Sequence, residues 1–145
     1  MHIAALVTWL ITALGGFYLL GTWIARGALR APGSSRLPAP VLFGHFLLAA
    51  AGLVVWIIYL AADKKALAWT AFGLLVPVAL LGLVMFARWL PGVRTRHAVT
   101  AASAPAPAAP AEAAPERHFP IAVVLGHGLF AVATVILVLI SAIQK

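Results

Sequence analysis

Two histidines stand in the same local setting, each directly after a glycine and inside a long apolar run. His45 lies in the stretch LFGHFLL and His127 in the stretch VLGHGLF. An imidazole inside a membrane needs partners for one donor and one acceptor nitrogen, and ionisable side chains there face the bundle interior and mark functional sites by default. One haem iron satisfies both histidines together, because it takes two axial imidazoles, one on each face. The pair therefore predicts a haem b with His45 and His127 as its metal ligands.

The residues around each histidine are small, which suits a flat macrocycle. Positions four and seven residues further along a helix share the face of the histidine, and the preceding glycine removes more bulk. We predict a cofactor site lined by Gly44, Ala49, Gly52, Gly126, Ala131 and Thr134. Guanidinium groups form charge-assisted hydrogen bonds with carboxylates. The haem propionates are therefore expected to pair with arginines that follow the first apolar run, namely Arg26, Arg30 and Arg36.

Four apolar runs must position these residues. The chain has 145 residues, of which 64% are hydrophobic and 9% charged, so its apolar surface is too large for one small soluble core. Each run is long enough to cross a membrane as a helix. We predict one membrane domain, 1–145, folded as an all-α integral membrane four-helix bundle with helices at about 3–25, 40–62, 66–87 and 119–143. An Ala/Pro-rich segment, 98–116, is expected to be a solvated, flexible cytoplasmic linker.

The positive charges lie unevenly between the runs. Seven of the ten Lys and Arg residues fall between the first and second or the third and fourth runs, and the others are Lys64, Lys65 and Lys145. The positive-inside rule then puts the arginine-rich loops in the cytoplasm of a bacterial-type inner membrane, with both termini outside. Tryptophans and tyrosines near the helix ends are expected to anchor in the headgroup region. They are Trp9, Trp23, Trp56, Tyr59, Trp69 and Trp89.

The second and fourth runs resemble each other. Alignment of His45 with His127 also matches the preceding glycines, several alanines and leucines, and an upstream proline, Pro40 or Pro120. Two interpretations stay open: two tandem parallel two-helix hairpin repeats, or chance matches between alanine- and leucine-rich helices. On either, both histidines lie roughly 8–10 Å in from the cytoplasmic edge, at a rise of about 1.5 Å per residue.

The architecture resembles that of bis-histidine b-type cytochromes built inside membrane four-helix bundles. The resemblance implies an electron-transfer protein or the haem subunit of a membrane redox complex, and not an enzyme on its own. The alternative is a non-catalytic accessory subunit without a cofactor, since small residues also allow ordinary close helix packing. Expected partners are membrane lipid, a quinone or other redox subunits, and a second copy of the chain. Nucleic acid is not expected, because no basic face on a soluble domain is available.

Overall fold

The structure, a computed structural model, describes residues 1–30, 33–101 and 114–144, with side chains 95–101 outside the description. These residues form four α-helices and one short 3₁₀-helix, and no strand occurs among them. The elements are α1 (His2–Ala25), α2 (Ala39–Ala62), α3 (Lys65–Ala101), η1 (Pro115–His118) and α4 (Ile121–Ile143). The predicted all-α fold is therefore confirmed.

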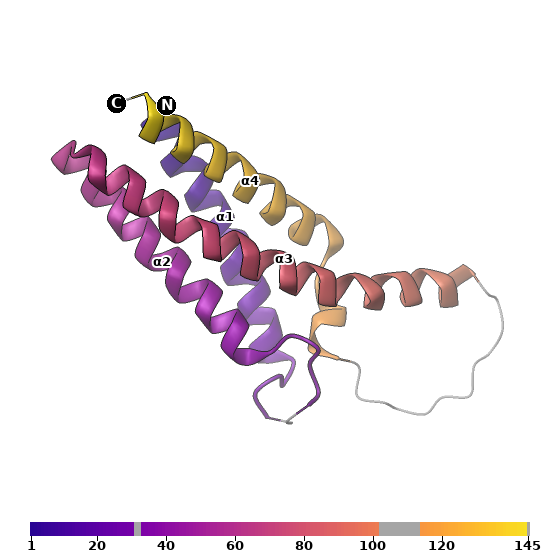
Figure 1. The fold of residues 1–145 in the computed structure, drawn as a ribbon. Helices are drawn as coiled ribbons and strands as arrows, with labels where there is room; N and C mark the ends of the chain where they lie inside the picture. The colour runs from indigo at the N-terminus through magenta and orange to yellow at the C-terminus, as the bar shows by residue number, and fades with distance from the viewer. Residues whose placement is uncertain (31–32, 102–113, 145) are drawn as a thin grey trace.

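All four helices are long and apolar enough to cross a membrane, over His2–Ala25, Ala39–Ala62, Lys65–Arg94 and Ile121–Ile143. The chain is thus a multi-pass membrane protein. Three of the helices match their predicted bounds within two residues, but α3 runs on well past the predicted residue 87. Figure 1 shows its last part leaving the bundle in a new direction. Pro91 lies in this part, and its ring removes a helical hydrogen bond and bends helices.

The helix ends follow from local chemistry. Gly27 ends α1 in the left-handed conformation (φ 82°), so that the N–H groups of Gly27 and Ala28 donate to the carbonyls of Ile24 and Trp23. Both α2 and α4 begin after an extended proline, Pro38 or Pro120. Proline is favoured there because it has no N–H to leave unpaired and cannot continue a helix backwards.

The bundle consists of two closely packed helix pairs, α1 with α4 and α2 with α3. The pairs meet mainly through α3 and α4, and α1 contacts α2 over a shorter stretch. The two histidine-bearing helices, α2 and α4, lie diagonally opposite each other. Figure 1 places both termini at one end of the bundle, together with the α2–α3 turn. We call this the terminal end. The opposite end, with residues 26–30, 33–38 and η1, is called the arginine end.

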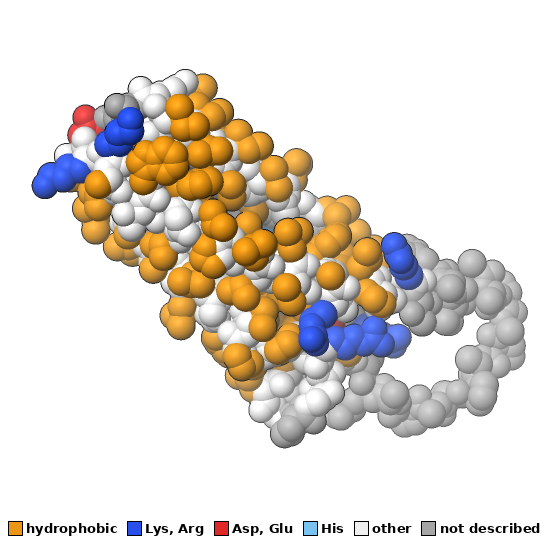
Figure 2. Space-filling view, in the orientation of Figure 1, with side chains coloured by type: hydrophobic (Ala, Val, Ile, Leu, Met, Phe, Trp, Pro, Cys, Tyr) orange, Lys and Arg blue, Asp and Glu red, His pale blue; other side chains and the backbone are white. Residues whose placement is uncertain are grey.

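The exterior of the bundle is apolar along its length. Many of its large hydrophobic side chains are exposed, among them Leu14, Phe17, Leu47, Leu83 and Leu129. Figure 2 shows hydrophobic side chains along the visible face, with Lys and Arg at the two ends. This distribution fits a belt of lipid around the helices and water at both ends.

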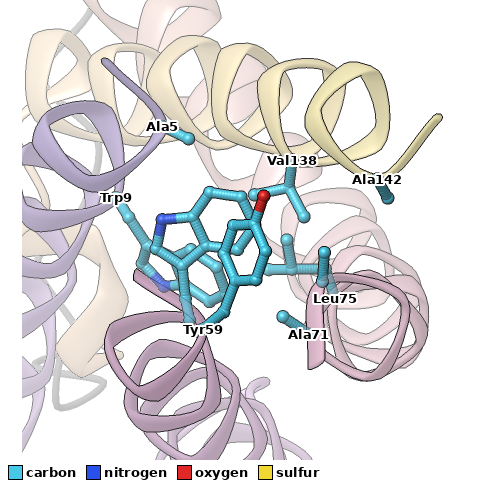
Figure 3. Packing of buried hydrophobic residues seen from close by; sticks show 9 residues of the cluster. Ala5, Trp9, Tyr59, Ala71, Leu75, Val138 and Ala142 are labelled. Atoms are coloured by element: carbon cyan, nitrogen blue, oxygen red, sulfur yellow. The ribbon is translucent and has the colours of Figure 1, made fainter. Parts of the chain in front are cut away.

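The buried core has two separate clusters. One lies toward the terminal end and contains Trp9, Trp56 and Tyr59 with smaller residues of α3 and α4, as Figure 3 shows. The other lies toward the arginine end and consists of Trp23, Leu37, Leu42, Trp89 and Phe119. Four of the tryptophans and Tyr59 are thus enclosed by protein, so their predicted role as headgroup anchors is wrong. Only Trp69, 44% exposed, is placed to act in that way.

Between the two clusters lies a layer in which no side chain is fully buried. No buried residue occurs in 10–22 of α1, 43–51 of α2, 79–88 of α3 or 120–133, which includes most of the first half of α4. Protein interiors are normally packed as densely as organic crystals. We call this segment the middle layer, and both His45 and His127 lie within it.

The two halves of the chain share one structural register. Many positions 66 residues apart in α1 and α3 share their burial, and so do many positions 82 residues apart in α2 and α4 or just before them. Buried residues coincide in both cases: Ala5 with Ala71, Trp9 with Leu75, Trp23 with Trp89, Leu37 with Phe119, Gly52 with Thr134, Trp56 with Val138, and Tyr59 with Ser141. This supports the predicted parallel repeat. In this register the proline that corresponds to Pro120 is Pro38 and not Pro40. Trp69 likewise does not correspond to Trp9.

Candidate functional site

The two histidines face each other across the middle layer. The centroids of the His45 and His127 rings are 6.2 Å apart, with a 54° angle between the ring planes. Each ring is tied to the neighbouring helix by one hydrogen bond. The Nδ1 of His45 lies 2.9 Å from the Val78 carbonyl oxygen of α3, and the Nδ1 of His127 lies 2.9 Å from the Thr12 carbonyl oxygen of α1.

A glycine makes each of these carbonyls accessible. In a helix, the side chain at position i+4 covers the carbonyl of residue i, because side chains point back toward the N-terminus. Four residues after Thr12 stands Gly16, and four residues after Val78 stands Gly82. A Cβ at Gly16 would lie 3.1 Å from His127 Cε1, and a Cβ at Gly82 would lie 3.3 Å from His45 Cε1. Because Gly16 and Gly82 have no side chain, each imidazole ring can approach the carbonyl beside it. We call these two glycines the seats of the rings.

The hydrogen bonds determine which nitrogen carries the proton. A carbonyl oxygen only accepts, so each neutral ring must be protonated on Nδ1 and must have a lone pair on Nε2. No second hydrogen bond of either ring occurs within the described part of the chain. Metal-binding histidines usually have this arrangement, with one nitrogen on the metal and the other donating to a carbonyl or carboxylate.

The ring separation agrees with two imidazoles on opposite sides of one metal ion. Two metal–nitrogen bonds of about 2.0–2.1 Å each, plus ~1.1 Å from each nitrogen to its ring centre, give ~6.3 Å. The centroids are 6.2 Å apart. Together with the incompletely buried middle layer, this donor set fits a bis-histidine haem.

The small residues predicted to line the site have different surroundings. Gly44, Ala49, Gly126 and Ala131 are half-buried in the middle layer, as the histidines are. A Cβ at Gly126 would meet nothing within 4 Å, and a Cβ at Gly44 would meet only Leu81 Cδ1, at 3.8 Å. Of the two glycines, only Gly126 thus has open surroundings.

The two positions seven residues after the histidines serve helix packing. A Cβ at Gly52 would lie 3.1 Å and 3.2 Å from two ring carbons of Trp9. The Thr134 Oγ1 lies 3.0 Å from Thr8 Oγ1 and 2.8 Å from the Phe130 carbonyl oxygen, within hydrogen-bond distance of both. Gly52 and Thr134 therefore lie at the border of the site toward the terminal end, where they pack against residues of α1 and α4.

The three predicted arginines are exposed at the arginine end. The buried cluster around Trp23 and Trp89 lies between this end and the histidines. Arg26 caps α1, and the backbone N–H of Arg36 donates to Glu116 Oε1 at 2.8 Å. The structure brings the two histidines together, but it does not bring Arg26, Arg30 or Arg36 to them, and their pairing with propionates stays a prediction.

A polar network at the arginine end was missed by the sequence reading. Glu116, expected in the flexible linker, lies in η1, is only 3% exposed and accepts from the Ser35 hydroxyl at 2.8 Å. Ser35 Oγ in turn accepts from the Trp23 indole N–H at 2.8 Å. The predicted linker 98–116 is thus wrong at both ends, since α3 continues to Ala101 and Pro115–His118 is folded. Its middle, 102–113, lies outside the described residues. The proline and acid in the sequence PERH were the available signals for a short helical turn.

Comparison of the chain with protein-family models, with curated proteins and with solved structures found no match. The site must therefore be interpreted from its own geometry.

Proposed function

We propose that this chain is a small b-type cytochrome, or the haem subunit of a membrane redox complex, with His45 and His127 as axial ligands. The haem, when bound, supplies one-electron transfer. The protein residues hold and orient it: the Thr12 and Val78 carbonyls fix the two tautomers, and Gly16 and Gly82 admit the rings. As an electron carrier or redox subunit, the chain would not be an enzyme on its own.

One observation carries the proposal: two imidazoles from diagonal helices, 6.2 Å apart, each with its Nδ1 on a carbonyl. The diagonal arrangement supports it, since one ligand comes from the α1–α4 pair and the other from the α2–α3 pair. A flat ring between the pairs would then be coordinated from both sides. Both histidines lie in the middle layer, where no side chain is fully buried.

The second candidate is an accessory subunit without a cofactor. The hydrogen bonds from His45 to Val78 and from His127 to Thr12 favour it, because they join the helices within each pair. Interhelical hydrogen bonds of this kind contribute about 0.6 kcal/mol in membranes. This candidate accounts for the hydrogen bond at each Nδ1. It gives no role to the Nε2 atoms of the two rings in the middle layer. We therefore prefer the haem proposal.

We further propose that the arginine end faces the cytoplasm of a bacterial-type inner membrane and that both termini lie outside. The support is the charge distribution, with Arg26, Arg30, Arg36, Arg88 and Arg94 at one end and Lys64 and Lys65 at the other. The electron partner would be a lipid-soluble quinone or another membrane redox subunit. A second copy of the chain is the third partner we propose, because the exterior is apolar over its whole length.

The test is the visible spectrum of purified full-length protein produced with ample haem. The reduced-minus-oxidised difference should show a Soret shift and a sharp α band, with one haem per chain by pyridine haemochrome assay. His45→Ala and His127→Ala should each abolish the low-spin spectrum.

His118→Ala is the matched control, because His118 is exposed at the arginine end and bonds to the Pro115 carbonyl at 3.3 Å. It should leave the spectrum unchanged. A folded, haem-supplied wild-type protein with no Soret absorption would exclude the cytochrome and leave the accessory subunit.

A further inference from the structure

Donors from the first half of the chain hold the carboxylate of Glu116 at the arginine end. The Trp23 indole N–H donates to Ser35 Oγ, and the Ser35 hydroxyl donates to Glu116 Oε2, both at 2.8 Å. The backbone N–H of Arg36 donates to the other carboxylate oxygen, also at 2.8 Å. Trp23 and Glu116 are nearly fully buried, at 1% and 3% exposed. A carboxylate thus lies among buried donors, next to a tryptophan.

The shared register places a second tryptophan in the equivalent position. Trp89 is 66 residues after Trp23 and is also buried, at 5% exposed. Ser34 is 82 residues before Glu116 and so occupies the equivalent place in the α1–α2 segment. The position equivalent to the bridging Ser35 belongs to Arg117, whose long side chain is exposed.

This second position has donors but no acceptor. Trp89 Nε1 and Ser34 Oγ are both buried atoms, and neither has a hydrogen-bond partner in the described part of the chain. A buried polar group without a partner costs about 1–3 kcal/mol, so buried donors in native proteins are nearly always matched. One carboxylate oxygen can accept from an indole N–H and a hydroxyl together. Glu116, beside Trp23 and Ser35, is the example of a carboxylate in this setting.

Trp89 also lies on the side of the middle layer toward which a group bound at the histidines could extend, toward the arginine end. Trp89 follows Gly82, the seat of His45, by seven residues, or about 10 Å along α3. It belongs to the buried cluster that separates the middle layer from the arginine end. The charge nearby is positive, because Arg88 donates from Nη1 to the Arg36 carbonyl at 3.1 Å.

We propose that Trp89 and Ser34 form a carboxylate site, and that it takes a propionate of the haem. This inference rests on the proposed function and refines it. The donors that select the propionate are an indole N–H and a serine hydroxyl, in place of the exposed Arg26, Arg30 and Arg36. Beside Trp23 the carboxylate is that of Glu116, part of the chain itself. Only the Trp89 side therefore takes a propionate, and this sets the direction in which the macrocycle lies.

The experiment compares two porphyrins that differ only in their carboxylates. Full-length apoprotein in nanodiscs is titrated with haemin and with haemin dimethyl ester, and the Kd of each is read from the Soret band. Wild-type protein should prefer haemin. Trp89→Phe and Ser34→Ala should each reduce that preference about 10-fold or more, as expected for lost hydrogen bonds to a charged group. Their affinity for the ester should change less than about twofold.

Trp69→Phe is the matched control, since Trp69 is the one tryptophan with a large exposed fraction. In ¹⁵N-tryptophan spectra, the indole signal that disappears in Trp89→Phe should shift on addition of haemin but not of the ester. This measurement needs no variant to bind haem.

Two results would overturn the inference, and they are distinguishable. An equal haemin-to-ester ratio in wild type, Trp89→Phe and Ser34→Ala would mean that water satisfies the two donors, while the histidine ligation would stand. Failure of both porphyrins to give a low-spin spectrum in wild type would instead refute the haem proposal, and the propionate site with it.

Discussion

The seats of the two histidine rings allow the most exacting test of the site. Gly16→Ala would add a Cβ 3.1 Å from His127 Cε1, and Gly82→Ala would add one 3.3 Å from His45 Cε1. Contacts this short force the neighbour to move by a few tenths of an ångström. The ring would be displaced from a carbonyl that now lies 2.9 Å from its Nδ1.

Two effects on the free energy of unfolding oppose each other in the apoprotein. Alanine favours helix over glycine by about 0.5–1 kcal/mol. The weakened interhelical hydrogen bond costs up to about 0.6 kcal/mol. The apoprotein should therefore unfold at nearly the same denaturant concentration as wild type. Haem binding has no such compensation, because loss of the group that orients a metal ligand lowers affinity about 10- to 100-fold.

The assay is a Soret titration of each variant, together with its unfolding curve without haem. The same helices offer matched controls, Gly21 of α1 and Gly73 of α3, where an added Cβ meets nothing within 4 Å. Gly21→Ala and Gly73→Ala should keep haem affinity and gain a little stability. Equal haem affinity of Gly16→Ala, Gly82→Ala and both controls would refute the role assigned to the two seats.

Three further predictions concern stability, measured as the free energy of unfolding in detergent. Glu116→Ala leaves the donors around it unpaired and should cost about 2–3 kcal/mol. The control Arg26→Ala, at an exposed residue, should change the free energy by no more than about 0.5 kcal/mol. A Glu116→Ala effect as small as that of the control would contradict the network. Trp23→Phe should cost about 1 kcal/mol more than Trp56→Phe, because both changes remove the same ring volume from a buried site but only Trp23→Phe breaks an indole hydrogen bond. The reverse order would show that the indole assignments are wrong. Thr134→Val should cost about 0.6 kcal/mol for its hydroxyl bond to α1, and no change would mean that this bond is not formed.

The spans and the paired histidines were predictable because both depend on local sequence. Twenty or more apolar residues suffice for a span, and the depth of His45 and His127 follows from helix rise and topology. Their direction toward each other was not predictable. It depends on the rotation of α2 and α4 about their axes, which packing against α3 and α1 determines.

The glycine seats and the buried Glu116 were missed for a different reason. Gly16 and Gly82 function through helices to which the histidines do not belong, so no local pattern connects them. A search for matching registers between α1 and α3 would have found them with Trp23 and Trp89. Glu116 stands in a sequence of alanines and prolines that resembles a linker, and only its contact with Ser35 reveals its place.

The pairing of α1 with α4 has a consequence for synthesis of the protein. The first of the four described spans enters the membrane before its packing partner exists, while α2 and α3 are joined by a short turn and can pair at once. Until α4 is inserted, the Thr12 carbonyl beside Gly16 lacks the His127 imidazole that donates a hydrogen bond to it. The centre of the protein is therefore completed by the last described span, so any ligand of both histidines must be added after translation of that span.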